Sequence, residues 1–108
     1  MQRKQALDEL IQFKDNYKEL IGELKKLPWD TKETLIILKK QDVTNAIKTC
    51  IDGKKTINDL IDWSNAIEGR DDIDFESSFL QEIIFELSNA EINNINNKET
   101  LLELLKRI

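Results

Sequence analysis

Histidine is absent from this chain of 108 residues, and cysteine and glycine are scarce, with one and three copies respectively. Without histidine, the chain cannot assemble the Ser/His/Asp or Cys/His sets of common nucleophilic enzymes. Three scattered glycines do not form a phosphate-binding loop, and no Cys/His cluster has the spacing of a zinc site. We therefore expect a protein that is not an enzyme and that holds no metal ion or cofactor.

Long apolar runs are also missing. No stretch of about 18 apolar residues is present, so the sequence predicts no membrane-spanning helix. The opening residues, MQRKQALDEL, are charged and no apolar stretch follows them, so we do not expect a signal peptide. The single cysteine, Cys50, excludes an internal disulfide and fits a reducing compartment. Together these absences predict a cytoplasmic protein.

What is present indicates one globular domain spanning residues 1–108. Apolar residues make up 40% of the chain and charged residues 34%. That balance favours a folded core beneath a highly charged surface over a disordered chain. The length also fits a single domain that needs neither a disulfide nor a metal ion to fold.

The net charge is concentrated in one quarter of the chain. The segment Asp52–Glu76, called the acidic segment below, contains eight acidic and three basic residues and so carries the whole net charge of −5. A negative chain is poorly suited to nucleic acid, because phosphate contacts need clustered Lys and Arg. A concentrated negative field instead attracts cationic partners and speeds their encounter.

Apolar periodicity predicts an all-α fold: a compact bundle of about five helices, with a long N-terminal helix and a short irregular segment at residues 28–40. Pro28 should end the long helix. The apolar run Leu35–Leu38 is compatible with either an extended segment or a single turn. The predicted helices span residues 1–27, 42–51, 56–69, 75–87 and 97–107.

Particular residues mark the predicted helix ends. Thr56 and Asp59 have the spacing of an approximate capping box at the start of the central helix, and Gly69 is a suitable stop. Asp74 is expected to cap the next helix, where its carboxylate also favours the positive end of the helix dipole. Asn96 is the expected cap of the last helix.

Several other side chains are assigned to the core. Cys50 lies on the apolar face of its helix, and Trp63 lies on the core side of the central helix. Trp29 is interpreted as a core anchor at the end of the bundle, with a binding hot spot as the alternative. Ile92 and Ile95 are expected to turn inward from a polar, asparagine-rich loop.

The end of the acidic segment allows three interpretations of its carboxylates: Glu68, Asp71, Asp72, Asp74 and Glu76. Carboxylates alone can serve as a general acid and base, or bind a hard cation. The run lacks the D-x-[DN]-x-[DN]-G spacing of a calcium loop, so a solvated turn is the simpler interpretation. The cluster is nonetheless denser than capping requires, and a cationic partner would relieve its self-repulsion.

Four runs carry a resemblance to a known group of proteins: Tyr17–Ile21 (YKELI), Leu27–Asp30 (LPWD), Asp62–Ile73 (DWSNAIEGRDDI) and Ile84–Asn89 (IFELSN). In this order they resemble small all-helical bacterial immunity proteins of polymorphic and contact-dependent inhibition toxin systems. The third run is the most specific. The resemblance implies a protein that binds a toxin domain stoichiometrically in the cytoplasm and has no catalytic residues.

The charge and the resemblance together lead to a hypothesis. The chain neutralises a cognate toxin domain, a nuclease, by blocking its basic substrate cleft with an acidic surface. It contacts neither nucleic acid nor membrane itself, and is a monomer or weak dimer. The alternative is a helical adaptor or regulatory module with no toxin partner. The predicted partner-binding residues are Asp59, Asp62, Glu68, Asp71, Asp72, Asp74 and Glu76.

Overall fold

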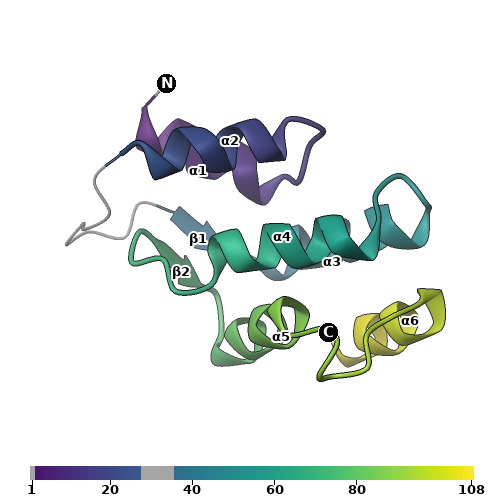
Figure 1. The fold of residues 1–108 in the computed structure, drawn as a ribbon. Coiled ribbons are helices and arrows are strands. Elements are labelled where there is room, and N and C mark those ends of the chain that lie inside the picture. Colours follow the sequence, from purple (N-terminus) through teal and green to yellow (C-terminus); the bar gives the residue numbers. More distant parts are fainter. Residues whose placement is uncertain (1, 28–35) are drawn as a thin grey trace.

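The computed structural model describes residues 2–27 and 36–108, and within these ranges the fold is mostly helical, as predicted (Figure 1). Two short strands accompany the helices. None of the described helices is long and apolar enough to cross a membrane. The elements in chain order are α1 (Arg3–Ile11), α2 (Tyr17–Lys25), β1 (Ile36–Leu38), α3 (Lys40–Ile51), α4 (Ile57–Ile67), β2 (Ile73–Phe75), α5 (Ser78–Ser88) and α6 (Lys98–Arg107).

The prediction of one long N-terminal helix is wrong, because the chain reverses between α1 and α2 and the two helices lie side by side (Figure 1). Phe13 lies in the turn with a positive φ of 52°, which ends the helix. Its ring is buried and lies 5.2 Å from the rings of both Tyr17 and Trp63. Burial of Phe13 against these two rings stabilises a backbone conformation that a non-glycine residue seldom adopts.

The second difference is a pair of parallel strands. The apolar run Leu35–Leu38, which the sequence allowed to be either an extended segment or a single turn, is extended at Ile36–Leu38. Residues 28–35, which include Trp29 and Leu35, lie outside the described residues. In the register of β1 and β2, Ile37 pairs with Asp74. The two strands are joined by α3 and α4, because a parallel pair needs a long crossover connection.

Asp74 therefore does not cap α5, as had been predicted, but lies within β2. The helix begins later, at Ser78, and Ser77 caps it by accepting a hydrogen bond at Oγ from the backbone N–H of Leu80 (3.3 Å). Phe75, which was predicted to open the helix, also belongs to β2.

Helix α4 lies between the α1–α2 pair and α5 (Figure 1). Its predicted capping box is confirmed: the backbone N–H of Asp59 donates to Thr56 Oγ1, and that of Thr56 donates to Asp59 Oδ2. Gly69 follows the helix with a φ of 78°, which glycine adopts without strain, so the predicted stop is also confirmed. Trp63 is fully buried and donates from Nε1 to the backbone oxygen of Leu10 in α1 (2.7 Å).

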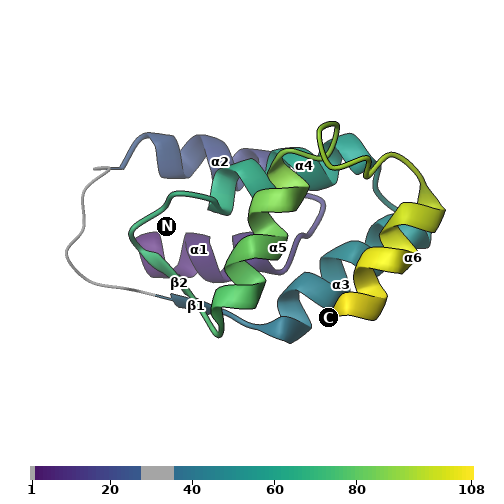
Figure 2. The ribbon, with the colours of Figure 1, turned by 90° about the horizontal axis from the view of Figure 1, so that it is seen from below.

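The C-terminal helix α6 lies beside α3 (Figure 2). Its cap is Asn97 rather than Asn96, since Asn97 Oδ1 accepts from the backbone N–H of Thr100 (2.9 Å). In the preceding loop Ile95 is buried as predicted. The prediction for Ile92 is wrong, because this side chain is 81% exposed.

Candidate functional site

The seven predicted binding residues do not form one continuous surface. Asp59 and Asp62 project from α4, and Glu68 lies at the C-terminal end of that helix. The connection to β2 supplies Asp71 and Asp72, the strand supplies Asp74, and Glu76 directly follows the strand. Two of the seven carboxylates, those of Asp59 and Asp72, are engaged in contacts that hold the fold together.

Asp59 joins α4 to α2. Besides its capping role, its Oδ1 accepts a hydrogen bond from the hydroxyl of Tyr17 (2.5 Å), and Lys18 Nζ lies 3.9 Å away. The hydrogen bond from Tyr17, followed by that from the Thr56 backbone, holds the pKa of Asp59 below its usual range. Burial and the same hydrogen bond raise the pKa of Tyr17 well above its usual range. The Asp59 carboxylate thus already has hydrogen-bond partners within the chain when no other protein is bound.

Asp72 is buried, with an exposed fraction of 1%. Its carboxylate accepts two hydrogen bonds from Arg70, at 2.8 Å from Nε and 2.9 Å from Nη2, and Arg3 Nε of α1 lies 3.8 Å away. This geometry fixes the connection between α4 and β2 against α1. The prediction of a surface carboxylate at this position is wrong, because Arg70, two residues earlier, turns it inward.

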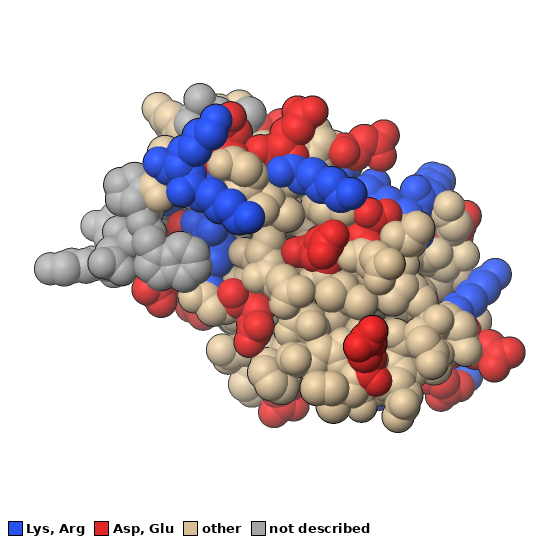
Figure 3. All heavy atoms as spheres, viewed as in Figure 1, with Lys and Arg blue, Asp and Glu red and all other residues tan. Residues whose placement is uncertain are grey.

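The other five predicted residues are exposed: Asp62, Glu68, Asp71, Asp74 and Glu76. Among the residues that the structure describes, none of the five forms a salt bridge. On the face of the molecule that Figure 3 shows, some acidic side chains lie beside Lys and Arg side chains, and others are surrounded by uncharged surface. The five predicted acids come from different elements, from Asp62 in α4 to Glu76 just after β2.

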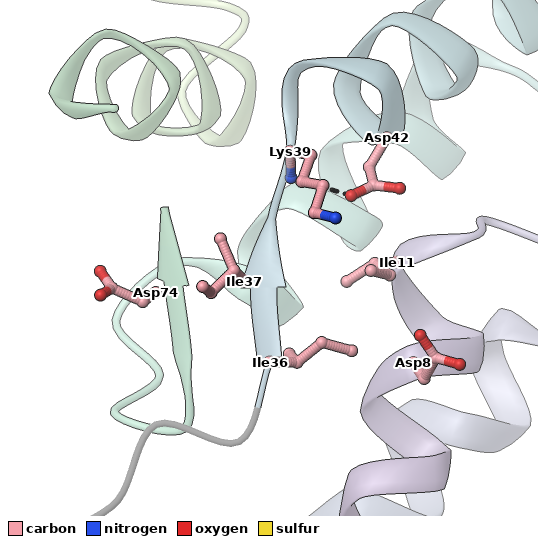
Figure 4. A pocket seen from close by; sticks show the side chains of 7 residues that line it. All are labelled: Asp8, Ile11, Ile36, Ile37, Lys39, Asp42 and Asp74. Atoms are coloured by element: carbon pink, nitrogen blue, oxygen red, sulfur yellow. Dashed lines mark hydrogen bonds between the residues drawn. The ribbon is translucent and has the colours of Figure 1, made fainter. Parts of the chain in front are cut away.

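A first hollow of about 630 Å³ lies where β1 meets α1 and the start of α3 (Figure 4). Ile36 extends from β1 toward Ile11 of α1, and Ile37, which is 49% exposed, extends toward β2. Asp42 caps α3 by accepting from the backbone N–H of Lys39 (2.8 Å). The lining residues are Asp8, Ile11, Ile36, Ile37, Lys39, Asp42 and Asp74.

Only Asp74 of this hollow had been predicted as a binding residue. Asp8 and Asp42 were missed, because they come from segments that carry no excess charge in the sequence. Asp74 lines the same hollow as these two residues because β2 pairs in parallel with β1, and no local sequence pattern predicts that pairing.

A second hollow of about 650 Å³ runs along α5 and is called the α5 groove below. Phe85, 55% exposed, and the half-buried Phe75 provide its apolar surface. Arg107 reaches it from α6 and pairs with Glu86 at 3.1 Å. Of the predicted binding residues it contains Glu68. The full lining is Glu68, Gly69, Phe75, Ser78, Gln81, Glu82, Phe85, Glu86 and Arg107.

The described residues contain no group of three or more acidic or cysteine side chains placed to hold a metal ion. Cys50 is half-buried, and burial, followed by the negative charge of Asp59, raises the pKa of its thiol to about 11. The thiol is therefore protonated at neutral pH and a weak nucleophile. The arrangement is suited to contact with a partner surface: exposed carboxylates border two hollows with apolar floors.

Comparison of the chain with protein-family models, with characterised proteins and with solved structures finds no match. The resemblance to immunity proteins therefore depends on the sequence runs alone.

Because Asp72 forms a buried ion pair with Arg70 and Asp71 is exposed, replacing these two adjacent aspartates should affect stability differently. Asp72→Ala should lower the free energy of unfolding by about 3 kcal/mol, because it leaves the Arg70 guanidinium without its buried carboxylate. Asp71→Ala removes the same charge from an exposed site and should change that free energy by less than about 0.5 kcal/mol. Urea unfolding of both variants measures the difference, and equal effects would contradict the assigned role of Asp72.

Asp59 should make stability depend on pH in the acidic range. Its pKa in the folded chain lies below the unfolded value of about 3.9, so its contribution is present above that pH and is lost as pH falls through the folded pKa. The difference in unfolding free energy between the wild type and Asp59→Asn should therefore narrow below about pH 4. Denaturant unfolding at several pH values measures it, and a constant difference would contradict the assignment.

Proposed function

We propose that this chain is an immunity protein that binds and neutralises a cognate bacterial toxin domain. The toxin is a nuclease, and the chain blocks its basic substrate cleft with acidic surface. The protein works in the cytoplasm, as a monomer that forms a stoichiometric complex. It contacts neither nucleic acid nor a membrane, and it catalyses no reaction.

The observation that carries this proposal is the set of exposed carboxylates between the end of α4 and the start of α5: Glu68, Asp71, Asp74 and Glu76. Within the described parts of the chain, none of them forms a salt bridge. Like charges that lack a salt-bridge partner on a short segment repel one another. A cationic partner turns that repulsion into attraction across the interface.

A nuclease domain is a partner of the right chemistry. Its substrate is a polyanion, so its cleft contains clustered Lys and Arg side chains. Carboxylates fixed on an inhibitor can contact those cations and exclude the substrate by charge and by volume. The resemblance to bacterial immunity proteins that DWSNAIEGRDDI carries supports the same assignment.

The fold supports inhibition through preorganisation. The acidic connection is anchored by the buried Asp72–Arg70 pair and continues into β2, whose backbone is hydrogen-bonded to β1. Carboxylates on an anchored segment lose little conformational freedom on binding, so more of the interaction energy contributes to affinity. The exposed acids can therefore meet a complementary cleft without refolding.

Charge reversal provides the test. The double variant Asp71→Lys/Glu76→Lys should slow association with the proposed cognate toxin domain by at least about tenfold and weaken protection of cells that produce the toxin. Both positions are exposed, so folding should be retained. Asp72 is left intact because its reversal would unfold the connection.

The matched control is Glu91→Lys/Glu99→Lys, which alters net charge by the same amount at exposed positions outside the acidic segment. This control variant should associate with the toxin domain at most of the wild-type rate. Stopped-flow association kinetics and nuclease assays on the purified pair measure the effects. Equal slowing by both double variants would remove the acidic segment from the mechanism, and a toxin domain that does not bind the wild type would refute the proposed function.

A further inference from the structure

The α5 groove contains an aromatic side chain that the core does not use. Helix α5 buries its apolar face through Leu80, Ile83, Ile84 and Leu87. Phe85 lies outside that face, 55% exposed, and Phe75 of β2 lines the same groove. An exposed phenylalanine in a hollow that a second phenylalanine also lines offers a partner a large apolar contact area.

Carboxylates line the same groove as these two phenylalanines. On α5, Glu82 lies one turn before Phe85, and Glu86 directly follows Phe85 in the sequence. Glu68 lines the groove from the end of α4. Arg107, the single basic lining residue among those described, is already paired with Glu86 at 3.1 Å. Glu82 makes no salt bridge with any described residue. The groove therefore combines an apolar floor with an unneutralised negative border.

We propose that the α5 groove is the docking site for a basic segment of a protein partner that carries a bulky apolar side chain next to Arg or Lys. The apolar side chain packs on Phe85 and Phe75, and the neighbouring cations contact Glu82 and Glu68. The volume of about 650 Å³ accommodates such a group of side chains. The identification of this partner as the toxin domain rests on the proposed function.

Charge complementarity favours a basic protein segment over the other possible occupants of the groove. A second copy of the chain, placed symmetrically on the groove, would bring Glu82 and Glu68 against their own equivalents, which is repulsive. Nucleic acid would meet the same carboxylates with its phosphates. The first hollow, at Ile36 and Ile37, is the weaker candidate for the same partner, because Lys39 lies among its acids and none of the described residues that line it is aromatic.

Nuclear magnetic resonance titration with short synthetic helical peptides tests the groove independently of the toxin. The probes are an amphipathic peptide of leucine and arginine, a matched peptide with serine in place of leucine, and one with glutamate in place of arginine. The leucine–arginine peptide should shift the amide signals of α5 and of residues 68–76 in a saturable manner. Each of the other two peptides should bind at least about tenfold more weakly.

Two pairs of variants assign the contacts. Phe85→Ser and Glu82→Lys should each weaken the leucine–arginine peptide by at least about tenfold. The controls Leu102→Ser and Glu99→Lys alter an exposed apolar and an exposed acidic residue of α6 outside the groove, and should leave binding nearly unchanged. All four positions are exposed, so the amide spectra should stay those of the folded chain.

Absence of saturable shifts, shifts centred on another surface, or equal loss in variants and controls would overturn the groove as the docking site. Such a result leaves toxin neutralisation standing if the toxin domain still binds the wild type. Conversely, peptide binding at the groove without toxin binding would retain the docking site and refute the proposed partner.

Discussion

The Trp63 indole is the contact on which the arrangement of this molecule depends. Its Nε1–H donates to the backbone oxygen of Leu10, and its ring packs against Phe13 in the turn between α1 and α2. One buried side chain thus joins α4 to α1 and to the turn that follows it, with its polar atom satisfied inside the core. Gly69 turns the chain at the end of α4 toward β2 and α5. Because the Trp63 indole holds α4 in place, the positions of the exposed acids in that connection depend on this indole.

Asp72 completes this arrangement and separates the acidic residues into two kinds. Its buried contacts with Arg70 and Arg3 anchor the connection to α1, as the capping box of Asp59 anchors the start of α4. Acids of this kind already have partners and support the fold. Acids of the second kind, such as Asp71 and Asp74, are exposed on the same anchored segment and can meet a cationic surface. Net charge alone does not distinguish them.

Local patterns predicted α4 well, because the Thr56 capping box and the Gly69 stop act within a few residues. They failed where distant parts of the chain decide the structure. The apolar spacing continues across the turn at Phe13 because α1 and α2 bury the same core, so periodicity could not reveal the reversal. Asp74 resembled a helix cap, but its strand is set by pairing with Ile37, far away in the chain. The hollows beside the acids likewise depend on tertiary packing.

We propose that the surface formed by the end of α4, by β2 and by α5 binds a basic partner. Amide hydrogen exchange of the chain, alone and bound to its proposed cognate toxin domain, tests this binding surface. Exchange should slow on binding in residues 68–86 and change little in α3, because α3 supplies none of the described residues that line the α5 groove. Protection confined to α3, or spread evenly over the chain, would contradict this binding surface.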